Sequence, residues 1–343
     1  MSKVISSSLK YHYDEELFNN AWTSEKDPTS TVLLESGAMV EDATIAGLIS
    51  GGGNYFTIPF YKDIEGNELN YDGATDITTD DTEDGTQSGV VYGRSKGWES
   101  TIFINDFTAA DPMRNILNRI QKWKAKKVQA RVISILEAIL GITGATGYAA
   151  EWANHKTDIT SSSSTVTDAN KIGLTTLRDA AVKANGDAAD DYSLAIMHSA
   201  VANRLSQFNV LEFFKYNDAR GQELDVKVGR SGNMIVLICD EVPHAADTNG
   251  NMVYTTYLLG RGVLLHANAP VEKPSDYQYD PKTKGGKEYL YTRYRETIHP
   301  NGFTFSMANL PVSPTDAQLG TTANWSIVMN PKNIAIASLK TNG

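Results

Sequence analysis

One pattern constrains this chain more than any other, an apolar stripe that runs from Asp111 to Leu140. Apolar residues recur there at three- and four-residue spacing, which predicts a single amphipathic helix. The residues of the stripe are Ile116, Ile120, Trp123, Val128, Val132, Ile135, Leu136 and Ile139. Pro112 fits the first turn, where its missing N–H is not needed, and Gly141 and Gly144 end the helix. About thirty residues at 1.5 Å each make a rod of roughly 45 Å, which predicts a backbone for the rest of the fold.

The charges of the chain are unevenly distributed along the sequence. Tyr61–Val90 has nine acidic residues against the single Lys62, a net charge of −8, within a chain of 343 residues whose total is −10. Asp111–Leu140 has the opposite balance, with seven basic and two acidic residues and a net charge of +5. Two interpretations stay open on charge alone. Each segment has a solvated charged face, or the two surfaces pair, within one chain or between copies of it.

The acidic segment lies between two strand-like stretches. Tyr55–Tyr61 alternates and is rich in aromatic and branched residues, and Val90 begins the return, which predicts a long hairpin. Pro59 favours an edge or an arm over a central strand. The connection is too long and too polar to build a core of its own, so we expect a functional excursion. The glycine run Gly51, Gly52 and Gly53 just before it is expected to act as a hinge.

The rest of the chain mixes helices and strands without a regular βαβ rhythm or an internal repeat, which predicts an α+β class. Helices are expected at 168–184 and 200–208. Strands are expected at 192–197, 233–239, 253–266, 324–329 and 333–339, and a hairpin at 289–305 that turns at His299–Gly302.

Several function classes have little support in the sequence. An acidic chain with a pI near 5.1 argues against a dedicated nucleic-acid reader. Cys239 is the one cysteine, so no intrachain disulfide or multi-cysteine metal site is possible. No phosphate-binding glycine loop is present, the six histidines are scattered, and the Asp247–Asn251 stretch departs from a calcium loop and predicts a turn. We therefore expect no catalytic residues, no cofactor and no metal. Neither a secretory signal nor a membrane span is indicated, because charges and glycines interrupt the apolar runs.

The order of several short motifs resembles the major capsid proteins of tailed bacteriophages, which share the Hong Kong 97 fold. The resemblance spans nearly the whole chain, although each motif alone is weak. The motifs are Glu35-Ser36-Gly37, Gly51 to Gly53 before Ile58-Pro59-Phe60, Asp63-Ile64-Glu65-Gly66, Arg94 followed by Trp98, Ala110-Asp111-Pro112-Met113, Asn324-Trp325, Lys332-Asn333-Ile334 and Leu339 to Gly343.

The resemblance implies a capsid fold with four parts. These are an N-terminal arm at 1–50, an extended loop at 51–104, a peripheral domain with the spine helix at 105–164 and 283–343, and an axial α/β domain at 165–282. In that fold the extended loop lies across a neighbouring subunit near its spine helix, so the opposed charges become candidate contacts between subunits. The candidates on the loop tip are Asp76, Asp80, Asp81, Glu83 and Asp84, and those on the helix are Arg114, Arg119, Lys122, Lys126 and Lys127.

The resemblance also implies a function and partners. The chain is expected to self-assemble into hexamers and pentamers of an icosahedral head that encloses double-stranded DNA without sequence-specific binding. A separate scaffolding protein and a portal are expected partners, assembly is expected in the host bacterial cytoplasm, and the mature location is the virion. An encapsulin-like or other shell-forming protein is the first alternative. An extracellular β-rich binding or hydrolytic domain is the second, and a small monomeric particle with a defined ligand would favour it.

Overall fold

The structure, a computed structural model, describes residues 36–62, 68–71, 83–102, 112–208, 212–217, 223–231 and 234–343. Its helices are α3 Ala43–Ser50, α5 Pro112–Leu140, α6 Tyr148–Glu151, α7 Thr176–Asn185, α8 Ser199–Gln207 and α9 Asp316–Leu319. Its strands are β1 Met39–Glu41, β2 Tyr55–Tyr61, β3 Asp84–Val90, β4 Tyr92–Thr101, β5 Lys156–Asp158, β6 Tyr192–Met197, β7 Glu212–Asn217, β8 Glu223–Ser231, β9 Met234–Ile238, β10 His244–Ala246, β11 Met252–Gly260, β12 Leu264–Ala269, β13 Ser275–Asp280, β14 Lys287–Pro300, β15 Phe303–Phe305, β16 Trp325–Ile327 and β17 Ile336–Thr341.

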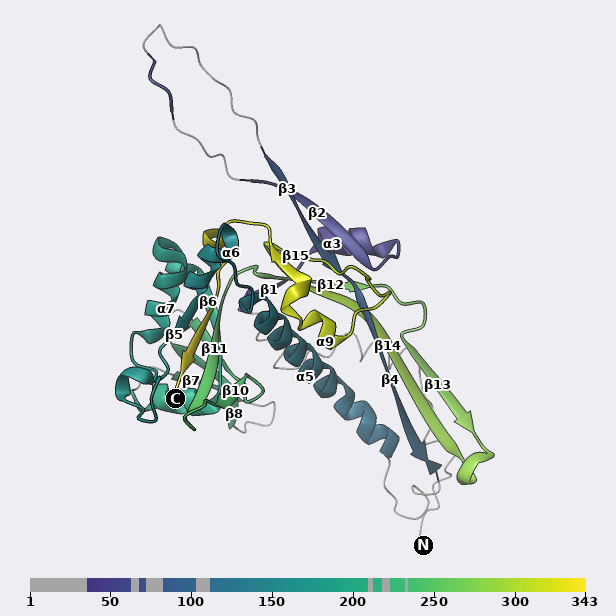
Figure 1. Cartoon of the computed structure of the whole chain (residues 1–343). Coiled ribbons are helices and arrows are strands. Elements are labelled where there is room, and N and C mark those ends of the chain that lie inside the picture. The colour runs from purple at the N-terminus through teal and green to yellow at the C-terminus, as the bar shows by residue number, and fades with distance from the viewer. Residues whose placement is uncertain are drawn as a thin grey trace.

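The predicted long helix is α5, which has 29 residues and crosses the middle of the subunit (Figure 1). Its apolar stripe faces inward as expected. The buried members are Ile120, Val128, Val132, Ile135, Leu136 and Ile139. Ile116 and Trp123, nearer the amino-terminal end, are half-buried. The helix is therefore embedded along its carboxyl-terminal half and more open along its amino-terminal half.

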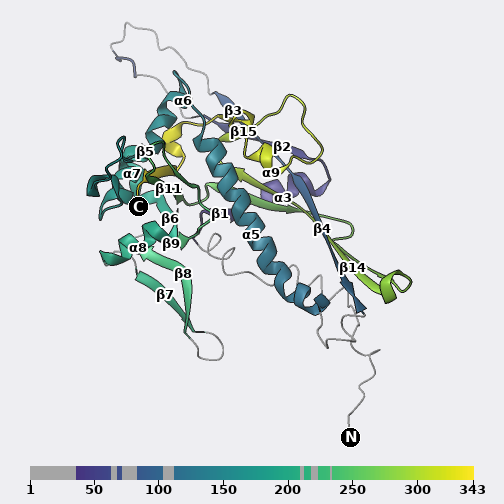
Figure 2. The same ribbon diagram turned by 60° about the horizontal axis from the view of Figure 1, so that its bottom comes forward.

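An eight-stranded sheet lies on one side of α5, in the strand order β5-β17-β11-β6-β9-β8-β7 with β10 beside β11. Pairings are antiparallel except that β6 runs parallel to β9 and β5 parallel to β17. All six residues of β6 are buried, because α5 packs on one face of the sheet and α7 and α8 cover the other. This explains why the predicted strand 192–197 is apolar except for Ser193. In Figure 2 the β7–β8 ribbon extends from this sheet on the side of α8.

A five-stranded sheet lies on the other side of α5, in the order β1-β12-β14-β13 with β4 on the opposite edge of β14. Side chains of β14 alternate between its two faces, and Leu290 and Tyr294 pack against Met113 and Ile120 of the amino-terminal half of α5. Strands β4, β13 and β14 form a narrow part of the sheet that extends away from the rest of the subunit (Figure 1).

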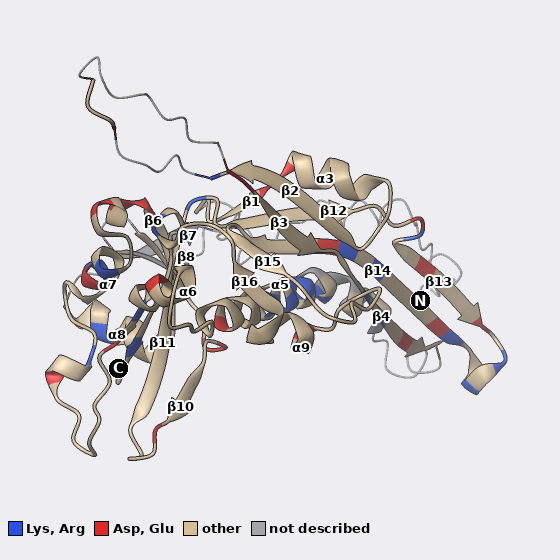
Figure 3. Ribbon diagram, turned by 45° about the horizontal axis from the view of Figure 1, so that its top comes forward, with Lys and Arg blue, Asp and Glu red and all other residues tan. Residues whose placement is uncertain are grey.

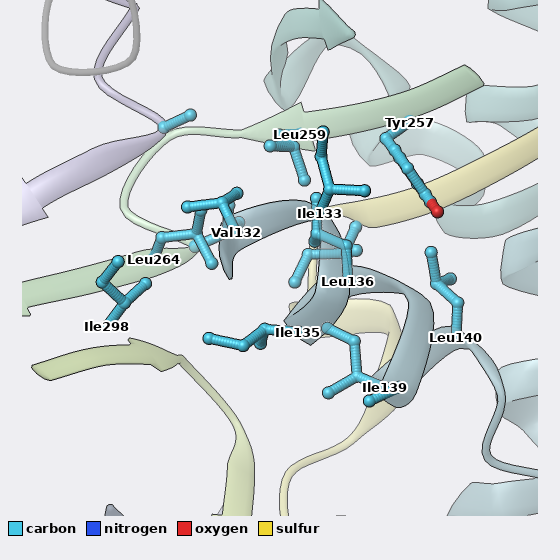
Figure 4. Packing of buried hydrophobic residues seen from close by; sticks show 14 of the residues in the cluster. Val132, Ile133, Ile135, Leu136, Ile139, Leu140, Tyr257, Leu259, Leu264 and Ile298 are labelled. Atoms are coloured by element: carbon cyan, nitrogen blue, oxygen red, sulfur yellow. The ribbon is translucent and has the colours of Figure 1, made fainter. Parts of the chain in front are cut away.

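The two sheets share one apolar core, which the carboxyl-terminal half of α5 fills (Figure 4). Leu136 and Ile133 lie beside Leu259 of the eight-stranded sheet, while Val132 lies toward Leu264 and Ile298 of the five-stranded sheet. Each fully buried aliphatic side chain contributes about 1.5 to 3 kcal/mol. The helix thus holds the two sheets in a fixed relation to each other.

Two of the sequence expectations about local structure are wrong. The segment 289–305 does not form a hairpin, because β14 pairs with β12, β13 and β4, whereas β15 pairs with β16. The Asn301-Gly302 turn instead moves the chain between sheets, and the Asn301 N–H donates to the Val263 carbonyl at 2.9 Å. The helix expected from residue 168 begins at Thr176, because 168–170 form a separate 3₁₀ turn.

The strand pairings also cross the expected domain boundary at residue 282. Strands β12 and β13, expected in the axial part, pair with β14 of the five-stranded sheet. Strand β17, expected in the peripheral part, pairs with β11 in the eight-stranded sheet. The chain passes more than once between the sheets, so sequence ranges alone do not separate them.

Candidate functional site: the projecting hairpin and the cationic face of α5

The predicted hairpin is present as a two-stranded ribbon that projects from the body of the subunit (Figure 1). Strands β2 and β3 are antiparallel, with Tyr55 opposite Val90 and Tyr61 opposite Asp84. Pro59 lies on this two-stranded ribbon, in agreement with its sequence interpretation as an edge or arm residue.

The base of the ribbon is packed firmly onto the body. Phe56 is 4% exposed and its ring meets the His299 ring edge-on, with centroids 5.7 Å apart. Gly89 faces this contact, and a Cβ there would lie 2.3 Å from the Phe56 ring. The absence of a side chain at Gly89 is therefore required for Phe56 to occupy its pocket.

Hydrogen bonds hold the same end of the ribbon. The buried Gln87 accepts from the Gly302 N–H through Oε1 at 2.9 Å. The hydroxyl groups of Thr57 and Ser88 lie 2.9 Å apart across the two strands. These contacts fix the direction in which the ribbon leaves the subunit.

The far end of the ribbon is exposed and charged. Lys62 and Glu83 form an ion pair at 2.6 Å, and the Lys62 N–H donates to the Glu83 carbonyl at 3.0 Å. The hydrogen bond and charge of Lys62 lower the pKa of Glu83, and Glu83 raises the pKa of Lys62. Tyr61 is 81% exposed and Tyr71 91% exposed. This end of the hairpin therefore presents acidic and aromatic groups to solvent.

The expected hinge residues lie between α3 and β2. Gly52 and Gly53 have φ values of +99° and +92°, which favour glycine, whereas Gly51 has φ −79°. An Arg295 guanidinium N–H donates to the Gly53 carbonyl, and the Asn54 amide donates to the Pro311 carbonyl at 3.1 Å. The conformation requires glycine at two of the three positions, and a hinge motion stays a prediction.

The amino-terminal half of α5 presents a cationic face. Arg119, Lys122, Lys126 and Lys127 are exposed, and none of them takes part in an ion pair among the described residues. The backbone of Arg114 lies in the helix, but its side chain is outside the described residues. Figure 3 shows these blue segments of α5 well separated from the red far end of β3. Among the described residues, neither Glu83 nor Asp84 forms an ion pair with a cation of α5 in the same subunit.

The loop-tip candidates divide between described and undescribed residues. Asp76, Asp80 and Asp81 lie outside the described residues. Glu83 and Asp84 are described and exposed, but Glu83 already has a partner in Lys62 of its own chain.

An ionic network centred on a buried Arg131–Glu296 pair, absent from the sequence expectations, extends to the half-exposed Asp316. Arg131 is 2% exposed and contacts Glu296 of β14 at 2.5 Å and Asp316 of α9 at 2.9 Å. Arg94 of β4 also reaches Asp316, at 2.7 Å. Both guanidinium groups lie over the Tyr92 ring, at 4.9 Å for Arg94 and 4.7 Å for Arg131. The network ties α5 to β4, β14 and α9.

The network keeps its groups charged despite burial. Burial alone would lower the pKa of Arg131, but Tyr92, Glu296 and Asp316 raise it above its usual value. Burial alone would raise the pKa of Glu296, but a His266 hydrogen bond and the charge of Arg131 lower it overall. The sequence carries one signal for this network, because Arg131 lies three residues after Val128 and four before Ile135, within the apolar stripe.

The remaining candidates for chemistry are structural in the described part of the chain. Within that part, no group of three or more His, Cys, Asp or Glu side chains is arranged to hold a metal ion. Cys239 is buried, and burial raises the pKa of its thiol. Asp247 accepts from the Asn249 and Asn251 N–H groups, each at 2.8 Å, which confirms the predicted turn. None of the described helices is long and apolar enough to cross a membrane.

Comparison of the sequence and the fold with known proteins identifies the family of this chain. The model of the Gp13-like family, described as major capsid protein 13-like, matches residues 110–335, about two thirds of the chain. The chain belongs to this family. The capsid protein is 25% identical to the major capsid protein of Bacillus phage SPP1 over 328 residues, which cover 95% of each chain. Its fold is similar to that of the Ralstonia phage GP4 capsid, with a TM-score of 0.59 and 13% identity over 99% of this chain and 98% of the other.

These findings confirm the expected α+β capsid fold and the structural role of a major capsid protein of a tailed phage. They favour this role over the encapsulin-like and the extracellular alternatives. The two charged surfaces are the candidates for the contacts between subunits in a shell.

Proposed function

We propose that this capsid protein assembles into the hexamers and pentamers of an icosahedral head, with the hairpin of one subunit lying across α5 of its neighbour. The observation that supports the contact is the distance, in Figure 3, between the red far end of β3 and the blue segments of α5, both of which include exposed side chains. Contacts of Phe56 and Gln87 hold the base of the hairpin on the body, and the described Asp84 at its far end has no ion pair with α5. The proposed pairing is therefore between two copies of the chain.

Charge and apolar contact have different roles in this proposed interface. Exposed ion pairs contribute about 0 to 1 kcal/mol each, so the charges set the register of the hairpin on the helix. Tyr61, Leu69 and Tyr71 are exposed apolar or aromatic side chains near the acidic end. Their burial against a neighbour would supply about 25 cal/mol for each Å² of apolar area removed from water.

The pairing of Lys62 with Glu83 refines the acidic contribution. Lys62 neutralises Glu83 within its own chain, so Asp84 and the sequence candidates Asp76, Asp80 and Asp81 provide the acidic charge that faces the neighbour. On the helix, Arg119, Lys122, Lys126 and Lys127 provide the exposed partners, with Arg114 as the sequence candidate.

The four-part division of the subunit belongs to the same proposal. Residues 1–50 act as an arm, 51–104 as the extended loop, 105–164 and 283–343 as the peripheral part, and 165–282 as the axial part. Strands β12 and β13 lie in the axial range of the sequence but pair with β14 of the peripheral range, and β17 of the peripheral range pairs with β11 of the axial range. We therefore expect these two parts to move as one body joined by α5.

The wider role follows from charge and family. A container wall with a net charge of −10 holds DNA weakly, which suits a shell that encloses double-stranded DNA without binding a sequence. A separate scaffolding protein and a portal are the proposed partners. The proposed place of assembly is the host cytoplasm, the proposed destination is the virion, and the proposed role is non-enzymatic.

The interface is tested by neutralising the acidic end of the hairpin. A variant with Asp80→Asn, Asp81→Asn, Glu83→Gln and Asp84→Asn is expected to fold normally and to lose most of its shell yield, measured by sedimentation and electron microscopy at physiological salt. The matched control makes the same change of charge on exposed acidic residues elsewhere, with Asp187→Asn, Glu151→Gln, Glu241→Gln and Glu272→Gln. An unchanged yield for the hairpin variant would refute the pairing, and equal losses in both variants would assign the effect to net charge.

A further inference from the structure

The first turn of α8 is capped in an uncommon way, by a histidine. The Ala200 N–H donates to His198 Nδ1 at 3.1 Å, and the Ser199 N–H donates to Asp240 Oδ1 at 3.1 Å. The Val201 and Ala202 N–H groups donate to the His198 carbonyl. Serine, threonine, aspartate and asparagine are the usual residues at this position, and none of them changes charge near neutral pH. The cap of α8 therefore depends on a residue type whose ordinary pKa lies near neutral pH.

The hydrogen bond fixes the protonation state of this ring. Because Nδ1 accepts from the Ala200 N–H, it carries no proton, so the imidazole is neutral and its proton is on Nε2. Nε2 lies 3.9 Å from Asp240 Oδ1. A protonated ring could not accept at Nδ1, and it would place a positive charge at the positive end of the helix dipole.

Three groups from other elements face the ring. The His244 ring of β10 lies 4.7 Å from it between centroids, and the Tyr254 ring of β11 lies 4.9 Å away. His244 has its own Nδ1 at 3.0 Å from the Val242 carbonyl, which makes that nitrogen a donor. Asp240, in the turn after β9, is the third. A charge on His198 would be repelled by a charged His244 and attracted by Asp240.

We propose that His198 is a pH-operated latch, which in its neutral form caps α8 and on protonation leaves Ala200 to pair with Asp240. The two states are exclusive, because one nitrogen cannot hold a proton and accept from the Ala200 N–H. In the protonated state the cation also competes with the Ser199 N–H for Asp240 Oδ1. Acid therefore loosens the first turn of α8, and the contact of Asp240 moves from the Ser199 N–H to the His198 ring.

The direction of the pH dependence follows from the surroundings of His198. Burial lowers its pKa, Asp240 raises it and His244 lowers it, and the net pKa is below the usual value. A histidine with a lowered pKa in the folded state stabilises that state above its usual pKa, and the contribution is lost as pH falls through the lowered value. The latch is closed at neutral pH and opens as pH falls through the lowered pKa of His198.

Hydrogen exchange of the α8 amides in the full chain tests the latch. Loss of a cap changes helix stability by about 1 kcal/mol, so protection of 199–202 is expected to fall about fivefold as pH is lowered from 7.5 through the pKa of His198, after correction for intrinsic exchange rates. His198→Asn keeps a cap that does not titrate in this range, and its α8 protection is expected to stay constant. His244→Phe keeps a ring against Tyr254 and is expected to retain the loss with its midpoint at higher pH.

A titration of the His198 ring by NMR provides an independent readout. The expected result is a midpoint below that of an unstructured histidine, coincident with the loss of α8 protection. Protection that falls equally in His198→Asn, or that does not change while His198 titrates, would overturn the proposal.

Discussion

Replacing Arg131 by methionine tests how the buried network holds α5 to the five-stranded sheet. Methionine retains most of the apolar stem, so packing changes little and the guanidinium charge is what is lost. The side chains of Arg131 and Glu296 are each 1% exposed, so the carboxylate stays buried without its cation. Removing one partner of a buried ion pair costs about 3 to 5 kcal/mol. We expect Arg131→Met to lower the free energy of unfolding by this amount.

The assay is urea unfolding of the unassembled subunit near pH 7.5. Arg119→Met on the exposed face of the same helix is the matched control, with an expected change within about 0.5 kcal/mol. Adding Glu296→Gln to Arg131→Met is expected to restore much of the loss, because no unpaired charge is then buried. A loss below about 1 kcal/mol in Arg131→Met, or a double variant as unstable as the sum of the single changes, would refute this account of the network.

Three further perturbations have direct structural expectations. Trp152→Ala removes a fully buried ring and should cost about 3 to 5 kcal/mol in urea unfolding, whereas Trp123→Ala removes a half-buried ring and should cost less. Gly52→Ala places a side chain at φ +99° and should cost about 1 to 2 kcal/mol, whereas Gly51→Ala, with open space and φ −79°, should be neutral in the same assay. Burial lowers the pKa of His299 from 6.5 to about 4, so its stabilising contribution is present above pH 6.5 and falls by about 3 kcal/mol toward pH 4. His299→Gln should flatten that part of the stability profile, and an unchanged profile would contradict the assignment.

The spacing of apolar residues along the sequence is sufficient to predict those helices and strands that have one strong apolar pattern. The stripe from Ile116 to Ile139 gave the position and length of α5, and the alternation of Tyr55–Tyr61 gave the hairpin. Charge counting located the acidic and the basic segments, because charge is a property of the sequence itself, and the pairing of the two segments stays a prediction. The resemblance to phage capsid proteins came from the order of weak motifs and not from any single residue, and the match to the family model confirmed it.

Other features depend on contacts between distant segments, which periodicity does not report. The turn at His299–Gly302 has hairpin residues, but the pairing of β15 with β16 is set by residues more than twenty positions later. The partners of Arg131 are 165 and 185 residues away, so a charged residue in an apolar stripe was the one local sign of the network. Lys62 pairs with Glu83 of its own chain, so Glu83 adds no net charge to the acidic surface. The net charge of a segment includes Lys62 but does not show which carboxylate it neutralises.

Electron microscopy of the purified protein tests the central claim of shell assembly most directly. The protein would be imaged over a range of concentrations at physiological salt, with and without a coexpressed scaffolding protein. The account predicts closed shells, curved sheets or rings of five and six subunits. Uniformly small monomers under all of these conditions would contradict it.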